Sequence, residues 1–226
     1  MGLVRDAKRD PNVRMVAFAL AAGVPLAAYL ATASAHDYWL DGGEFTAQAV
    51  DLDVSHPPGH PLAGLLGKLF TLLPLGPLPL RVALAQAFCA ALAAAFVYNA
   101  IDTTVRALGV ERDRLAVPVA LGGTWLVATS HAWWFQAVRP EVYALQMLLV
   151  AIAIDRVVAL EAAWPTHDVR PLYTAALALG LGLANHHFIA FLVFPALAPT
   201  LARVYRARGV RPLAWCGPAI AVGLSA

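Results

Sequence analysis

Residues 36–61 read HDYWLDGGEFTAQAVDLDVSHPPGHP, a polar stretch that lies between two long apolar parts of the chain. The stretch holds five of the fourteen acidic residues and three of the seven histidines, namely Asp37, Asp41, Glu44, Asp51, Asp53, His36, His56 and His60. Ionisable groups held between apolar segments of a membrane protein usually serve its function. This stretch therefore decides both the expected fold and the place of the expected site.

The composition predicts an integral membrane protein. Of the 226 residues, 60% are hydrophobic and only 13% are charged, with a mean hydropathy of +0.67, whereas a soluble domain carries roughly a quarter charged residues. Cys89 and Cys216 both lie in apolar runs and offer neither a disulfide framework nor a cysteine metal motif. Nothing resembles a basic surface for nucleic acid, so we expect no nucleic-acid partner.

The apolar runs on either side of the stretch predict an all-α fold with several membrane spans. A span needs about 20 apolar residues. The runs that we assign to the membrane are 15–35, 80–101, 115–129, 141–160, 172–200 and 213–226. Residues 62–75 are apolar but too short to span, which favours an interfacial or re-entrant helix. The first run ends in Ala33-Ser34-Ala35, which also fits a signal-peptidase site, although the run exceeds the roughly 7–15 residues of a signal-peptide core.

The run 172–200 is interrupted by Asn185-His186-His187 at its centre. Each half has roughly 13 residues, which is too short to cross upright. We therefore expect a helical hairpin whose turn lies within a protein-lined cavity.

The basic residues predict the topology. With the N-terminus in the cytoplasm, alternate crossing puts thirteen of the sixteen Lys and Arg residues inside and leaves Lys68, Arg81 and Arg139 outside, as the positive-inside rule requires. The same alternation collects six histidines, the loop carboxylates and Glu141 outside. We predict that the active face is non-cytoplasmic, and in a bacterium the membrane would be the plasma (inner) membrane.

The polar stretch contains a helical pattern. Five polar residues are spaced by four, three, four and three positions, which places them on one face of a helix: Asp37, Asp41, Glu44, Gln48 and Asp51. Tyr38, Phe45, Ala49 and Leu52 fall on another face. This pattern predicts an amphipathic helix at the membrane surface with its carboxylates in water.

Asp41 and Glu44 have two interpretations. Asp41-Gly42-Gly43-Glu44 fits a capping box, in which Asp41 is the N-cap and Glu44 reaches back from the third position. Gly42 and Gly43 are poor helix formers and allow a ligand to approach the backbone closely. We therefore favour a functional role for Asp41 and leave both interpretations open for Glu44.

Three further groups are candidate ligands. His56 and His60 are held by three prolines and a glycine and suit phosphate or metal, but no metal-binding spacing accompanies them. Arg139 lies on the side that disfavours positive charge, which suits a phosphate ligand or an ion pair with Glu141. Asn185, His186 and His187 lie at membrane depth, where polar groups are usually functional or satisfy the backbone at a helix break. We predict no metal site and no cofactor.

Two quoted motifs resemble a known family. Asp41-Gly-Gly-Glu-Phe45, followed by His56-Pro-Pro-Gly-His-Pro61 and by Leu65-Leu-Gly-Lys-Leu-Phe70, is similar to the first-loop signature of the DUF2723 family. That family includes the TMEM260-like protein O-mannosyltransferases and belongs to the GT-C glycosyltransferase superfamily. Gly180-Leu-Gly-Leu-Ala-Asn-His-His187 resembles its hairpin segment. The similarity covers about residues 36–205.

The resemblance implies one transmembrane GT-C-like domain over residues 1–226, with about six to seven spans and an interfacial amphipathic helix in the first non-cytoplasmic loop. Because family members are usually longer, we expect the chain to be truncated at its C-terminus. The resemblance also implies transfer of a sugar, mannose in the named members, from a polyprenyl-phosphate donor to a hydroxyl on a protein or glycan acceptor. Attack in a single displacement would invert the sugar's anomeric centre.

By this resemblance Asp41 is the catalytic general base, with Glu44 as a second catalytic carboxylate. The substrate-binding candidates are His56, His60, Lys68, Arg139, Glu141, Asn185, His186 and His187. The alternative is a non-enzymatic transporter or accessory subunit that binds a cation or solute through the same loop. A transporter more often has repeated halves and ionisable groups near the midplane, and no repeat is visible in this sequence.

Overall fold

The computed structural model describes residues 10–36, 40–57, 59–110, 112–165 and 168–224, and every regular element in these ranges is a helix. The helices are α1 (Pro11–Thr32), α2 (Gly42–Asp51), α3 (Pro61–Thr71), α4 (Leu78–Ala107), α5 (Asp113–Ala128), α6 (His131–Ala137), α7 (Tyr143–Ala162), α8 (Arg170–Arg208), α9 (Arg211–Ala214) and α10 (Cys216–Leu224). The predicted all-α class is confirmed. The predicted positions of Asp37 and Tyr38 on the loop helix lie outside the described residues.

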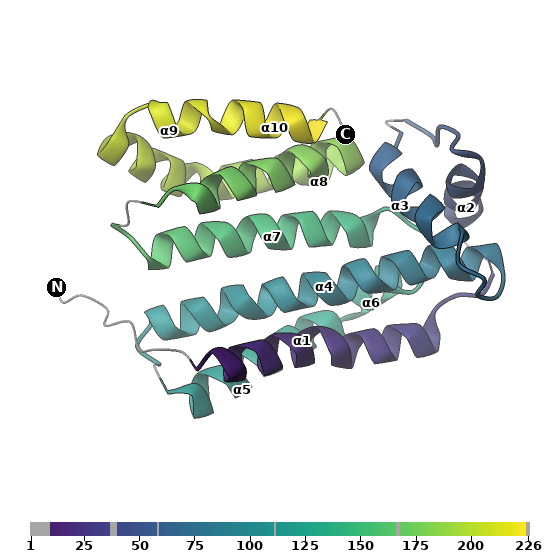
Figure 1. Ribbon diagram of the computed structural model, residues 1–226, viewed down its shortest axis with the longest axis horizontal. Coiled ribbons are helices and arrows are strands. Elements are labelled where there is room, and N and C mark those ends of the chain that lie inside the picture. The colour runs from purple at the N-terminus through teal and green to yellow at the C-terminus, as the bar shows by residue number, and fades with distance from the viewer. Residues whose placement is uncertain (1–9, 37–39, 58, 111, 166–167, 225–226) are drawn as a thin grey trace.

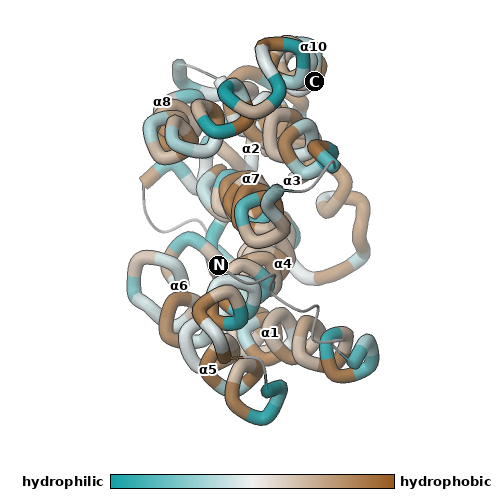
Figure 2. Tube along the Cα trace, turned by 90° about the vertical axis from the view of Figure 1, so that its left-hand side faces the viewer, coloured by the Kyte–Doolittle hydropathy of each residue, from teal (hydrophilic) through white to brown (hydrophobic). Residues whose placement is uncertain are grey.

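The long helices lie side by side as a bundle, with α4 and α7 at its centre (Figure 1). Alanines dominate the buried face of α4, among them Ala83, Ala87, Ala90 and Ala94, and such small residues let helix backbones approach closely in a membrane. In Figure 2 hydrophobic residues are spread along α7 and α4. Tyr29 of α1 is fully buried and donates to the carbonyl of Ala128 in α5 at 2.7 Å, which ties the outer helices together.

Four described helical segments are long and apolar enough to cross a membrane: α1, α4, α7 and residues Ile189–Arg208 of α8. A fifth span results if α5 and α6, which meet at a 70° bend, are counted as one broken crossing. The protein is therefore an integral membrane protein, but the predicted six to seven spans are not confirmed. The segments 113–128 and 216–224 are too short in this structure to count alone.

The predicted hairpin is present in α8. His186 has non-helical angles (φ −155°, ψ 90°), so the chain breaks at the predicted Asn185-His186-His187. The two halves then pack together, with Ala175 and Leu179 against Leu197. The predicted length of the second half is wrong, because that helix continues past Thr200 to Arg208 and reaches 20 residues.

The two ends of the bundle differ in charge. At the end where α4 and α7 finish, Arg106 forms ion pairs with Asp102 and Asp113, and Arg203 forms one with Glu161. The opposite end carries α2 and α3 and the break in α8 (Figure 1). The loop groups and the hairpin turn therefore meet at one end of the bundle, as the sequence predicted.

Candidate functional site

Asp41 occupies the N-cap position of α2, and its carboxylate makes no capping hydrogen bond. The capping box, one of the two interpretations that the sequence left open, is therefore not formed, because Glu44 accepts hydrogen bonds from His56 instead. The backbone of Asp41 still starts the helix, since its carbonyl accepts from the N–H of Phe45 at 2.9 Å. The exposed carboxylate of Asp41 thus carries no structural hydrogen bond at the helix start, which leaves it available to a substrate.

Phe45 and Ala49 are buried on the inner face of α2, as the sequence pattern predicted, and Glu44 and Asp51 are exposed. Gln48 was predicted on the water-facing side, but it is 4% exposed and packs against α3. The position of α2 at a membrane surface stays a prediction.

Glu44 and His56 form a hydrogen-bonded pair across the loop. The Nδ1 atom of His56 lies 3.0 Å from Oε2 of Glu44, and the His56 backbone N–H donates to Oε1 of the same carboxylate. The hydrogen bond that the His56 ring donates to Glu44 is the largest cause that raises the pKa of His56, and the hydrogen bonds that Glu44 accepts from His56 lower the pKa of Glu44. Asp41 and Glu141 lie close enough for their charges to raise the pKa of His56 further. His56 thus keeps its proton to higher pH than a free histidine.

His60 is the buried counterpart of His56. It is 2% exposed, and burial lowers its pKa. Its Nδ1 lies 2.6 Å from the carbonyl oxygen of Asn185. A carbonyl only accepts, so Nδ1 carries the hydrogen and Nε2 is left as the acceptor of a neutral ring. The ring stacks on His186 with 5.6 Å between centroids and lies 5.5 Å from the ring of His56. His60 therefore joins the loop to the break in α8.

Asn185 fixes the hairpin break to α7. Its side chain is fully buried and donates to the Val142 carbonyl at 3.1 Å and to Oε1 of Gln146 at 3.2 Å. Sequence reasoning missed Gln146, although a glutamine in an apolar span was itself a signal. The open alternative, that Asn185 satisfies backbone groups at a helix break, agrees with these contacts.

Arg139 and Glu141 form a buried ion pair just before α7. Nη2 of Arg139 lies 2.9 Å from Oε1 of Glu141, and the two side chains are 11% and 2% exposed. The guanidinium also lies 4.1 Å over the ring of Phe135, and Nη2 donates to Gln136 at 3.2 Å. Among the described residues no group forms a hydrogen bond with Nε or Nη1, and both atoms are buried. Burial raises the pKa of Glu141, and Arg139 partly offsets this effect.

Lys68 and His187, which the sequence predicted to bind substrate, contact other parts of the protein in this structure. Nζ of Lys68 donates to the carbonyl of Val50 at 2.5 Å, which is near the end of α2, so Lys68 holds α3 against α2. His187 lies 6.4 Å from the ring of Phe191 and close enough to His60 for its charge to affect that residue. The substrate-binding roles of both residues stay predictions.

Asp41, Glu44 and His56 could together hold a metal ion, since one ligand atom from each lies within 4.8 Å of the others. All three residues are exposed, and the atoms of Glu44 and His56 already satisfy one another. The metal-dependent alternative considered from the sequence, a membrane hydrolase, used His56, His60 and Asp41; the trio in the structure has Glu44 in place of His60. Metal binding by these three residues would therefore replace the hydrogen bond between Glu44 and His56.

The comparisons with known proteins give one family. Residues 41–208 match the model of the protein O-mannosyl-transferase TMEM260 N-terminal domain. The protein O-mannosyl-transferase TMEM260 of Mus musculus is 31% identical over 151 residues, which is 66% of this chain and 20% of that protein. The chain therefore matches about a fifth of the length of this curated relative. No solved structure is similar enough to match.

Proposed function

The chain belongs to the family of the TMEM260 N-terminal domain, and we propose that its end with α2 and α3 is the catalytic end of a membrane glycosyltransferase. The reaction is transfer of a sugar, mannose by analogy with the named relative, from a polyprenyl phosphate to a hydroxyl group of an acceptor. The active face is non-cytoplasmic and the N-terminus is cytoplasmic.

The observation that carries this proposal is the exposed carboxylate of Asp41, which makes no capping hydrogen bond and lies beside His56. Asp41 takes the proton of the acceptor hydroxyl as general base. The hydroxyl oxygen forms the new bond to the anomeric carbon, while the bond from that carbon to the phosphate oxygen breaks. The phosphate leaves with the electron pair, and its charge must be stabilised by fixed cations.

His56 and Arg139 are the groups best placed for that charge. His56 keeps its proton because Glu44 holds its ring. Arg139 is permanently charged and has two buried nitrogens, Nε and Nη1, without a hydrogen-bond partner among the described residues. An arginine binds a phosphate through two parallel hydrogen bonds, so a donor phosphate that reaches Arg139 would compete with Glu141 for the guanidinium.

Glu44, Glu141, Asn185, His60 and His186 act in this proposal by positioning. Glu44 orients His56, and Glu141 holds Arg139 before the donor binds. Asn185 and His60 hold the α8 break against the loop. The reacting groups are thereby fixed relative to the membrane, where the tail of the donor must stay.

The proposal is tested with the chain in lipid nanodiscs, a labelled polyprenyl-phosphate mannose and a threonine-containing peptide. We expect labelled peptide to form, and to form more slowly with the glucose donor. Donor binding without any transfer to peptides or glycans would contradict the proposed activity. The alternative of a solute-binding protein would then be favoured, and binding of Mn²⁺ to the Asp41, Glu44 and His56 trio would support it.

A further inference from the structure

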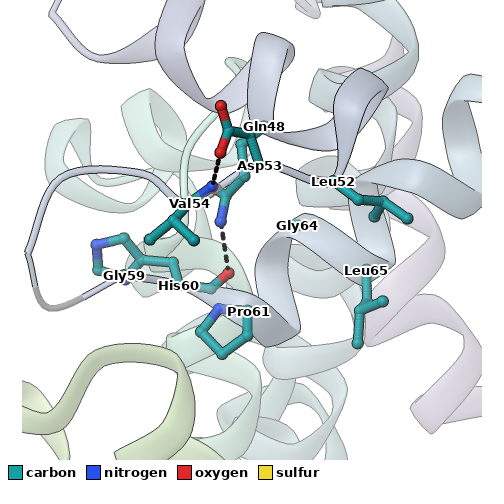
Figure 3. A pocket seen from close by; sticks show the side chains of 9 residues that line it. All are labelled: Gln48, Leu52, Asp53, Val54, Gly59, His60, Pro61, Gly64 and Leu65. Carbon is teal, nitrogen blue, oxygen red and sulfur yellow. Dashed lines mark hydrogen bonds between the residues drawn. The ribbon is translucent and has the colours of Figure 1, made fainter.

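A cavity of about 430 Å³ lies between α2 and α3, beside the candidate site (Figure 3). Its walls include Gln48, Leu52, Asp53, Val54, His60 and Leu65. The volume is within the range of pockets that bind small molecules or peptide side chains. None of the groups proposed above as base or phosphate ligand needs this space, so it has room for a further ligand.

The rim of the cavity is aliphatic and exposed. Leu52, Val54 and Leu65 are 53%, 82% and 49% exposed, although they lie in the loop and short helices outside the four candidate spans. Leu65 belongs to the helix expected at the membrane interface, but Leu52 and Val54 follow α2 in the polar stretch, where exposed apolar side chains around a hollow indicate a binding surface. Leu52 is the C-cap of α2, held at φ 57° in the left-handed region, and its N–H donates to the carbonyl of Gln48 at 2.9 Å. The end of α2 thus fixes Leu52 on the rim.

The floor of the cavity contains a polar group that lacks a partner. Gln48 donates from Nε2 to the carbonyl of His60 at 3.3 Å, and Figure 3 shows this bond beside the cavity. Oε1 of Gln48 is buried and has no hydrogen-bond partner among the described residues. A buried carbonyl oxygen without a donor is unfavourable. A turn about the terminal amide torsion, which is broad, would bring Oε1 to the cavity at the expense of the bond from Nε2 to His60. An N–H group bound inside the cavity would then supply the missing hydrogen bond.

The cavity borders the proposed catalytic groups through one residue. His60 lines the cavity, and its ring lies 5.5 Å from that of His56, which binds Glu44. A ligand in the cavity would therefore lie next to the acidic loop. The exposed Asp51 and Asp53 near its rim favour a neutral or basic ligand over an acidic one.

We propose that this cavity is the acceptor subsite and that it binds an extended polypeptide segment with aliphatic, neutral or basic residues beside the hydroxyl to be glycosylated. The inference rests on the proposed transferase function. A polypeptide offers both the N–H that Gln48 lacks and aliphatic side chains for Leu52, Val54 and Leu65. A glycan acceptor fits less well, because its many hydroxyls would meet only Gln48, Asp53 and His60 as polar side chains of the wall.

The first test is photo-crosslinking in nanodiscs without donor. The probes are two synthetic threonine peptides that differ only in carrying lysine or glutamate beside valine and leucine. A photoreactive benzoylphenylalanine replaces Val54 on the cavity rim, and in the matched control it replaces Leu69, which is exposed on α3 outside the cavity. We expect crosslinks at position 54 but not at 69, strongest with the lysine peptide. Equal crosslinks at both positions, or displacement of the peptide by polyprenyl phosphate, would overturn the proposal.

The second test is the kinetics of Val54→Asp with a neutral threonine peptide that carries valine and leucine but no lysine, so that the charge added at the rim meets only aliphatic side chains. We expect the KM for peptide to rise about tenfold or more while kcat changes much less, since charge disfavours burial of aliphatic side chains. Ala47→Asp, on the exposed face of α2 and away from the cavity, is the control and should leave the KM unchanged. Transfer by Val54→Asp with an unchanged KM for peptide would refute the acceptor subsite but not the proposed transferase function. Crosslinking at position 54 without any transfer by the unmodified chain would refute the proposed function and leave the peptide surface standing.

Discussion

Arg139→Met separates the structural role of the buried arginine from its proposed role in donor binding. Methionine keeps an unbranched side chain that packs on Phe135, whose ring lies 4.1 Å from the guanidinium. The substitution removes the only positive charge of the Arg139–Glu141 pair and leaves a carboxylate that is 2% exposed. Breaking one side of a buried ion pair costs about 3–5 kcal/mol, so we expect a loss of stability of that size at pH 8.

The loss should depend on pH with a defined sign. Burial already raises the pKa of Glu141, and without Arg139 that pKa rises further. A carboxyl group whose folded-state pKa lies above its unfolded value of about 4.3 destabilises the fold increasingly as the pH rises through the folded pKa. The penalty of Arg139→Met should therefore be smaller at pH 5 than at pH 8.

The control is Arg139→Met combined with Glu141→Gln, which removes both charges. We expect this pair to regain most of the lost stability, measured by reversible unfolding in mixed micelles at both pH values, but not donor binding, measured with labelled polyprenyl-phosphate mannose. Arg139→Lys keeps the charge without the two-pronged guanidinium and should weaken donor binding less than Arg139→Met. A single variant that loses under 1 kcal/mol, or a double variant that regains nothing, would refute this account of the pair.

Three further predictions concern the loop. A cysteine at Ala47 should be labelled from outside intact cells and one at Ala107 only after permeabilisation, in a chain whose native cysteines are replaced; the reverse labelling would invert the topology. Transfer should survive EDTA, because Glu44 and His56 already bind each other; loss of activity that one divalent ion restores would assign the Asp41, Glu44 and His56 trio to a metal. The stabilisation from the Glu44–His56 pair should be complete between about pH 4.3 and 6.5. It should decline at higher pH as His56 loses its proton through its raised pKa, and at lower pH as Glu44 gains one through its lowered pKa. Glu44→Gln should move the alkaline limb of the kcat/KM profile to lower pH, and an unmoved limb would show that His56 does not set it.

The sequence was sufficient for the features that depend on burial in a membrane. A polar triplet in the middle of an apolar run is costly inside a helix, so Asn185-His186-His187 marked the break in α8 correctly. The uneven distribution of Lys and Arg likewise indicated which loops share an end of the bundle. Both arguments need only composition and order along the chain.

The sequence was not sufficient where tertiary packing chooses among local options. The helical spacing placed Gln48 beside the carboxylates, but α3 covers that side of α2 and buries the amide against Gly64. The capping motif of Asp41 and Glu44 failed because His56, twelve residues along the chain, offers Glu44 a charged partner. Arg81, one of the three basic residues that the topology leaves outside, donates to the carbonyls of Thr71, Leu75 and Gly76 and closes the turn before α4, which the sequence did not indicate. Such contacts depend on how the loop folds back.

The turnover of Asp41→Asn tests the central claim most directly. Asparagine starts a helix about as well as aspartate but cannot accept the acceptor's proton at neutral pH. The variant should therefore fold and bind donor normally while kcat falls by about 10²–10⁴-fold, the usual contribution of a general base. Glu44→Gln is the matched control and should lose less, because Glu44 acts through His56. Near-normal transfer by Asp41→Asn would contradict the assignment of the base.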